Sequence, residues 1–478
     1  MRLLLSTFIA FTCLCVPVQA QDVITSNAAE GAGLLISDVD GALPKGMWRT
    51  NPRSEITYLL KTLPAEAPFK SLQQIKRNML ISTYDTSAID NDVAIKVGED
   101  LLTLRLAKLM ELGLWEDAAQ LYSNTTSDPG QNDDLAQIGV LLSLYKQGLA
   151  AACLENKAFG ARFTSKFWEE LGLICGEALN NEKIISTQFP DSPVFRGIYT
   201  EPDYLISAND LAPLSFLELM IANIENKITY SNFTLSPATP PRIIRVFLND
   251  EQFPAGQKTA LQSLAESKVV AISDSKKEEK NPSESNFDNQ LTNNIQMKDK
   301  ISPLLEAAQY VENNQKIPNN VIQKLLDNAG KNQENIFFLQ LLSSFGLTDI
   351  SLPFSEEQLT NALNAFPELY KKELQILKSW LDNSSEFSNN PSKVYEKQIN
   401  LADGENFTPS NGDWTKWLGK TTSHQLTGLS LLIVLNNNKN QGVRYDQLLN
   451  DLRTVGLIEQ AHQVARDMTA RLMRIKNN

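Results

Sequence analysis

Apolar residues at helical spacing dominate residues 93–179 and leave few alternatives to an α-helical fold there. Two adjacent stripes recur at intervals of three and four residues: Val97, Leu101 and Leu104, and Leu102, Leu106 and Leu109. Gly113 follows these stripes in the position of a C-terminal cap, and Gly148 follows the next apolar helix in the same way. Each glycine therefore predicts the joint of a helical hairpin.

The segments after these glycines share a pattern. Trp115, Ala118 and Tyr122 follow Gly113 at +2, +5 and +9, and Ala150, Cys153 and Lys157 follow Gly148 at the same offsets. A third copy lies near the end of the chain, with Gly456 followed by Ile458, Ala461 and Ala465. The pattern resembles a tetratricopeptide-like α-solenoid, which implies helical hairpins stacked as an irregular array. Lys157 replaces the aromatic residue of the motif, and an irregular helical bundle is the alternative.

A second resemblance concerns the overall layout. Trp48 follows Gly46, a leucine-rich segment comes next, Cys153 and Cys175 mark a two-cysteine hairpin, and a helical pair closes the chain. This layout resembles a family of secreted bacterial helical-repeat proteins, some of which are labelled antifreeze glycopeptide-related. The chain has no Ala-Ala-Thr tripeptide array, so the label predicts nothing about its activity.

The first twenty residues predict a cleaved secretory signal. Arg2 precedes an apolar run that is shorter than a membrane span, and the segment ends in a V-x-A pattern at Ala20. We expect cleavage between Ala20 and Gln21 and a periplasmic or secreted mature protein. Loss of the one positive charge of Arg2 changes the net charge from −12 to −13.

Composition shifts divide the rest of the chain into three parts. We expect an N-terminal helical-repeat region over residues 21–272, a flexible linker over residues 273–300 and a C-terminal helical region over residues 301–478. The linker sequence is polar, with a solvated two-turn helix near its end as the alternative, and limited proteolysis should cut there first. Residues 191–256 are rich in proline, and the segment ITYSNFTLSP within them is predicted to be an extended loop because a single strand cannot pair.

Cys153 and Cys175 are the two cysteines that remain after signal cleavage. An exported protein meets an oxidising compartment, and a turn near Gly160 would bring two antiparallel helices together. The sequence therefore predicts a Cys153–Cys175 disulfide, with two buried free thiols as the alternative.

No residue pattern nominates a catalytic or metal site. His424 and His462 each lack a second ligand at i+3 or i+4, and the loop Asp403–Asp413 misses the calcium-loop spacing. Glu266 lies in an Ala-Glu-Ser tripeptide but lacks the Gly-Leu-Met-Gln stretch of goblet-shaped lytic transglycosylases. We expect no catalytic residue, no metal and no cofactor.

The functional expectation is an exported, non-enzymatic interaction protein that binds an envelope protein or peptide through its helical-repeat surface. The negative charge repels phosphate backbones and anionic lipid, so neither nucleic acid nor membrane is an expected partner. Trp48, Trp414 and Trp417 are candidate anchors for the partner, and a place in a small core beneath a loop is the alternative for each of them. The alternative is a peptidoglycan-related hydrolase with an unrecognised carboxylate site, which would show perturbed acidic residues in one deep pocket.

Overall fold

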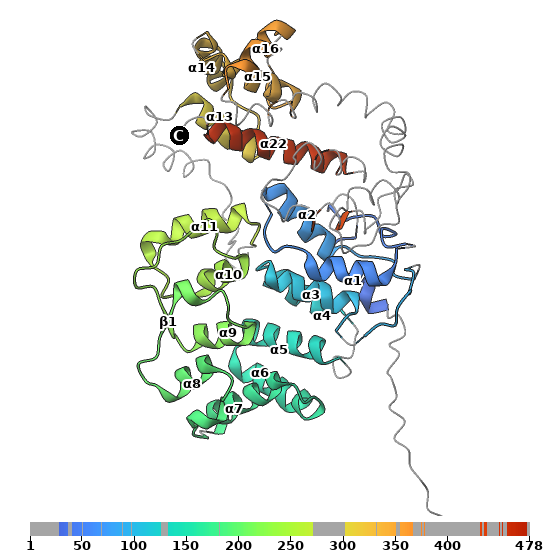
Figure 1. Ribbon diagram of the computed structural model, residues 1–478, viewed down its shortest axis with the longest axis vertical. Coiled ribbons are helices and arrows are strands. Elements are labelled where there is room, and N and C mark those ends of the chain that lie inside the picture. Colours follow the sequence, from blue (N-terminus) through green and yellow to red (C-terminus); the bar gives the residue numbers. More distant parts are fainter. Residues whose placement is uncertain are drawn as a thin grey trace, which may run out of the picture.

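A computed structural model gives the fold of the chain (Figure 1). It describes residues 28–36, 41–49, 51–67, 69–87, 89–96, 98–125, 132–180, 182–270, 302–330, 332–349, 354–366 and 457–475, and scattered helical positions between 374 and 452. The predicted signal segment, the predicted linker, Gly456, His424, the loop Asp403–Asp413, Trp414 and Trp417 lie outside the described residues.

The described part of the chain is predominantly all-α, as predicted. Its first helices run in chain order: η1 (Ala28–Gly31), α1 (Arg53–Thr62), α2 (Lys70–Ile81), α3 (Leu101–Glu111), α4 (Trp115–Ser123), α5 (Asp133–Gln147), α6 (Leu149–Phe159), η4 (Gly160–Arg162) and α7 (Lys166–Asn180). A second group follows: η5 (Ser186–Gln188), α8 (Pro193–Thr200), η6 (Ala208–Asp210), α9 (Phe216–Ile224), α10 (Pro241–Asn249), η7 (Ala255–Gln257) and α11 (Lys258–Ser267). The C-terminal helices are α13 (Pro303–Glu312), α14 (Asn319–Ala329), α15 (Glu334–Ser344), α16 (Glu356–Asn364) and α22 (Ile458–Ile475).

Local capping sets the ends of α3. The Asp100 side chain accepts a hydrogen bond from Thr103 N, so α3 begins at Leu101, later than a stripe starting at Val97 suggests. At its other end the amides of Gly113 and Leu114 donate to the carbonyls of Met110 and Leu109. This double hydrogen bond is a Schellman motif, and the positive φ of Gly113, 70°, allows it.

The helices up to α11 form two arms that lie side by side (Figure 1). The first arm comprises α1 to α7, and the second arm comprises α8 to α11. Consecutive helices from α3 to α7 pack against one another along the first arm, and α8 to α11 pack consecutively along the second arm, which runs back beside the first. Contacts between α9 and α5 and between α10 and α3 join the arms. The returning arm therefore covers a side of the first arm that a simple linear array would leave open.

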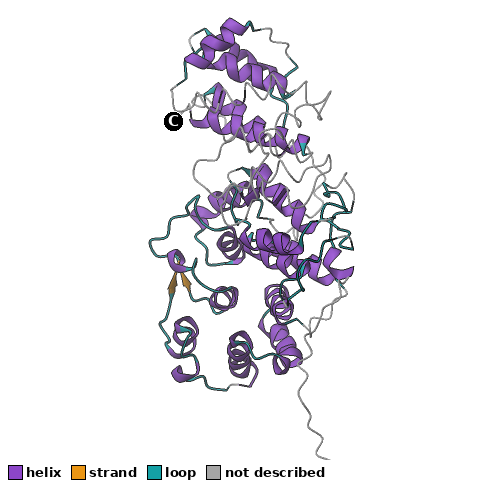
Figure 2. Ribbon diagram, turned by 45° about the vertical axis from the view of Figure 1, so that its right-hand side comes forward, coloured by secondary structure: helices purple, strands orange, loops and turns teal. Residues whose placement is uncertain are grey.

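The proline-rich part of the second arm contains short helices. Two of them, α8 and α10, have proline at the first helical position, where the missing N–H leaves no hydrogen bond unmade. The segment ITYSNFTLSP is not wholly a loop, because β2 (Ile228–Thr229) pairs in parallel with β1 (Ile206–Ser207) (Figure 2). The partner strand is only two residues long and left no alternating pattern to detect.

Helix α22 lies within the structure and not at its end. It packs against α13 of the C-terminal helices and against α2 of the first arm, and Asp467 Oδ2 accepts a hydrogen bond from Ser71 N at 3.0 Å (Figure 1). One buried stripe of α22 consists of Ala461, Val464, Ala465, Met468 and Leu472, and a second consists of Arg466, Thr469, Ala470 and Met473. Two partners thus cover two faces of α22.

Candidate binding groove

A groove of about 700 Å³ opens where the two arms meet. Its lining comes from five helices of both arms: Trp115 and Glu116 of α4, Leu144, Tyr145 and Lys146 of α5, Met220, Asn223 and Ile224 of α9, Arg245, Val246, Leu248 and Asn249 of α10, and Gln262 of α11. Because neither arm supplies the whole lining, the groove exists only when α8–α11 have packed against α3–α5.

The first arm contributes an aromatic pair and a polar chain. The rings of Trp115 and Tyr145 pack edge to face with their centroids 5.1 Å apart, and the Trp115 indole N–H donates to Met110 O at 2.9 Å. The Tyr145 hydroxyl donates to Glu116 Oε1 at 2.8 Å, and Lys146 forms an ion pair with the other oxygen of Glu116. Both oxygens of Glu116 therefore have partners within the first arm.

These contacts determine the ionisation states of Glu116 and Tyr145. Burial acts to raise the pKa of Glu116, but the hydrogen bonds from Lys146 and Tyr145 outweigh it and lower that pKa below its usual range. Burial raises the pKa of Tyr145 to about 12, and the bond to Glu116 adds to the shift. At neutral pH Glu116 is an anion and Tyr145 is a neutral donor, so neither is poised as a general acid near pH 7.

The second arm contributes a buried cation. Arg245 is 1% exposed, and its Nε donates to Gly113 O at 2.9 Å across the boundary between the arms. Its Nη2 atom is buried without a hydrogen-bond partner, as is Oδ1 of Asn223 on the neighbouring helix. Burial lowers the pKa of Arg245, while Tyr145 and Glu116 act in the opposite direction. An unmatched donor and an unmatched acceptor therefore belong to one groove.

The predicted repeat positions of the first hairpin lie at and beside this groove. Trp115 is on its floor, 2% exposed, and Gly113 provides the carbonyl that Arg245 binds. Ala118 is fully buried. Tyr122 lies over Gly139 of α5, where a Cβ atom would be 2.2 Å from the tyrosine oxygen. Burial, with a smaller effect of the charge on Glu155, raises the pKa of Tyr122 to about 12.

Two other predicted repeat positions, Gly148 and Ala461, do not line the groove. Gly148 joins α5 to α6 with φ 84° and ψ −174°, a conformation that differs from the Schellman motif at Gly113. Ala461 is fully buried in α22. Among the described repeat positions, only those of the first copy therefore lie at the groove.

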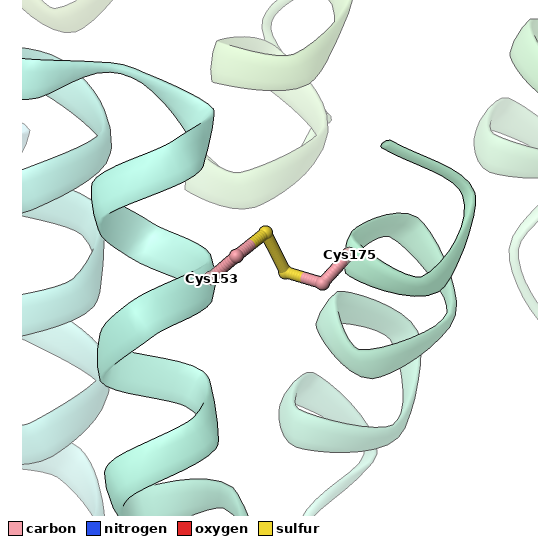
Figure 3. Close-up of a disulfide and its surroundings, with 2 residues drawn as sticks. All are labelled: Cys153 and Cys175. Carbon is pink, nitrogen blue, oxygen red and sulfur yellow. A yellow bond between two sulfur atoms is a disulfide. The ribbon is translucent and has the colours of Figure 1, made fainter. Parts of the chain in front are cut away.

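The two cysteines lie at disulfide distance, with an S–S separation of 2.00 Å and a Cα–Cα separation of 5.4 Å. Cys153 projects from α6 and Cys175 from α7, and their side chains point toward each other (Figure 3). The bond joins the two helices at the far end of the first arm from α22, and neither cysteine lines the groove.

Several sequence candidates have other environments. Trp48 is 1% exposed and packs edge to face on Tyr84, so it is a core residue and cannot anchor a partner. Glu266 is exposed near the end of α11 and does not line the groove. His462 is half-buried on α22 and already interacts with other groups of the protein.

The sequence did not point to Arg245 or Asn223. Arg245 lies 132 residues from Gly113, whose carbonyl it binds, and the helix that carries it was not predicted. The strong amphipathic pattern of residues 241–249 was a signal that could have found α10, since Ile243, Ile244 and Phe247 recur at helical spacing. No local pattern could have shown that Nη2 of this guanidinium lacks a partner.

Comparison with known proteins finds no family model that matches the chain and no match among curated proteins or solved structures. Within the residues described above, no helix is both long and apolar enough to cross a membrane. The same residues contain no group of three or more histidine, cysteine or acidic side chains arranged to hold a metal ion.

Proposed function

We propose that this chain is an exported, non-enzymatic interaction protein that binds a segment of an envelope protein or peptide in the groove between its two arms. The observation that carries the proposal is the groove itself. It combines buried aromatic and apolar residues with polar side chains at the rim, which is the composition expected of a protein-binding surface.

Export is supported by two independent features. The N-terminal segment has the order of charge, apolar run and small residue of a secretory signal. The Cys153–Cys175 pair lies at disulfide distance, and disulfides persist in oxidising compartments such as the periplasm. A net charge of −12 favours a protein or peptide partner over nucleic acid.

The groove gives less support to the hydrolase alternative. Its carboxylate, Glu116, has a lowered pKa and is paired with Lys146, whereas a general acid needs a raised pKa and a free path to its substrate. Turnover of purified peptidoglycan by the mature protein, abolished by Glu116→Gln, would contradict the non-enzymatic proposal.

The direct test is affinity capture from envelope extract with a groove variant beside a matched control. Ile224→Lys adds a charge at the rim of the groove at a side chain that is already exposed. Leu154→Lys makes the same change at an exposed leucine of α6 that does not line the groove. We expect the captured partner to be lost with Ile224→Lys and retained with Leu154→Lys. Equal capture by both variants would place the binding surface elsewhere.

A further inference from the structure

Arg245 is an exception among the buried cations of the described chain. Arg105 donates from all three of its nitrogens to the carbonyls of Leu80, Glu30, Ala32 and Ser82. Arg53 forms a two-bond ion pair with Glu30, and Lys76 and Lys108 donate to backbone carbonyls. Arg245 has a bond from Nε but none from Nη2. A buried guanidinium that is left partly unpaired costs free energy, so its retention needs a reason.

The acidic groups near Arg245 are already engaged with other cations. Glu116 is paired with Lys146, and Asp117 accepts two hydrogen bonds from Arg77, at 2.6 and 2.8 Å. Among the described residues no carboxylate lies within ion-pair distance of Arg245. The groove lining therefore contains two cations, Arg245 and Lys146, and one carboxylate, in a protein whose total charge is strongly negative. This local excess of positive charge is complementary to an anion.

We propose that Arg245 is the recognition point for an acidic side chain, aspartate or glutamate, of the partner segment in the groove. The proposal rests on the proposed function and adds the chemistry of the partner. A carboxylate supplies the acceptor that Nη2 lacks, and a guanidinium binds a carboxylate through parallel N–H donors.

The depth of Arg245 favours a side chain over a free carboxyl terminus. Lys146, Ile224, Asn249 and Gln262 are exposed at the rim, whereas Arg245 is almost wholly covered by protein. A long side chain reaches the floor while its backbone stays at the rim. A terminal carboxylate would bring the bulk of the backbone down with it. The unpaired Asn223 Oδ1 lies in the same lining and accepts a hydrogen bond from a backbone N–H of the passing segment.

The test uses synthetic decapeptide libraries as the probe and the full mature protein as the receptor. The first library is acetylated and amidated at its ends, so aspartate and glutamate are its sources of carboxylate. The second lacks aspartate and glutamate but has a free carboxyl terminus. We expect wild-type protein to enrich peptides of the first library with an acidic residue at one position. Replacing that residue by its amide should weaken binding about tenfold to a hundredfold, the size of a lost charge-assisted bond.

Variants separate recognition from folding. Arg245→Gln should bind the acidic peptide and its amide form equally, and Arg242→Gln, the same charge change on α10 outside the groove, should keep the preference. Asn223→Asp conserves shape and adds one negative charge to the groove. It should therefore weaken binding of the acidic peptide at least tenfold more than it weakens binding of the amide form. If Arg245→Gln fails to fold, the Asn223→Asp result decides the question.

Each remaining outcome contradicts a specific statement. Enrichment without an acidic position would overturn the role of Arg245 and leave the groove as a binding site. Enrichment from the free-terminus library alone would overturn the choice of a side chain. Failure to enrich any peptide from either library would overturn the proposed function and the role of Arg245 with it.

Discussion

Gly113 takes part both in the turn that ends α3 and in the packing of the two arms that forms the groove. Its φ of 70° completes the end of α3, and its carbonyl accepts the hydrogen bond from Arg245. A Cβ atom at this position would lie 2.5 Å from Pro241 O, at the start of α10. The absence of a side chain therefore permits both the turn and the close approach of the returning arm.

Substitution of this glycine separates the two effects. Gly113→Ala should destabilise the protein by about 2–3 kcal/mol, because it adds a steric clash to the strain of a positive φ. Gly148→Ala should cost only about 1 kcal/mol, since φ there is also positive but nothing lies within 4 Å of the added carbon. Urea unfolding of both variants measures the difference. Equal losses would show that the approach of Pro241 is unimportant.

At the scale of elements, the helix pairs α6–α7 and α2–α22 show specific contacts beyond apolar packing. The disulfide joins α6 to α7, and the bond from Ser71 N to Asp467 joins α2 to α22. The two contacts lie in different parts of the fold, so their effects on stability should add.

Removal of the disulfide should weaken the first arm. The disulfide closes a loop with a sequence separation of 22 residues. The chain-entropy relation therefore predicts that the double variant Cys153→Ser, Cys175→Ser loses about 3 kcal/mol of unfolding free energy. The measurement is the free energy of unfolding in urea, compared with wild type under oxidising conditions. Titration of denatured, unreduced exported protein should detect no free thiol. Two free thiols would contradict the bond.

Asp467 should make the contact between α2 and α22 dependent on pH. Burial raises the pKa of Asp467, against the opposing effect of its bonds from Ser71. Its favourable contribution is therefore complete below the ordinary aspartate pKa, about 3.9, and is lost as pH rises through the raised folded value. Asp467→Asn keeps an acceptor for Ser71 N and should reduce the loss of stability above pH 4, measured by urea unfolding between pH 4 and 7.

The control for this prediction is Asp85→Asn. Hydrogen bonds from Ser87 lower the pKa of Asp85, so its stabilising contribution is present above the ordinary pKa and is lost as pH falls. Asp85→Asn should therefore change the pH dependence below pH 4, with the opposite sign to the change that Asp467→Asn makes above pH 4. A pH profile of Asp467→Asn that matches wild type would show that Asp467 is not buried against α2.

At the scale of the whole molecule, α22 makes the C-terminal helices part of one structure with the first arm. Helix α22 contacts α2. In addition, Asn436, which precedes α22 in the chain, donates a hydrogen bond from Nδ2 to Leu59 O of α1 at 3.0 Å. Two helices from the early and late parts of the described chain, α2 and α22, thus lie side by side although they are far apart in sequence.

A cut in the chain should leave this contact intact. We expect a protein with a specific protease site inserted between residues 273 and 300 to remain one species after cleavage, because α22 still packs on α2. Size-exclusion chromatography of cleaved and uncleaved protein measures this, and both should elute at the same volume in native buffer. Elution of two separate fragments would contradict a stable contact.

The sequence by itself determined the local features of this protein. The spacing of leucines in residues 101–109 predicted α3, Gly113 predicted its end, and the third copy of the hairpin pattern, with Ala461 and Ala465, predicted a helix where α22 lies. These features depend on neighbours within a few residues, so they can be read from the order of the side chains. The proximity of Cys153 and Cys175 could be predicted for the same reason, because they lie on two consecutive helices that fold back on each other.

Only the tertiary structure decided which faces meet. The return of α8–α11 beside the first arm, the second buried face of α22 and the pairing of two-residue strands all depend on partners distant in sequence. Arg245 is the clearest case, since its burial, its bond to Gly113 and its unpaired Nη2 exist only after the two arms have packed. Packing between distant segments is set by shape and by the loss of water around whole faces, and a local pattern records neither.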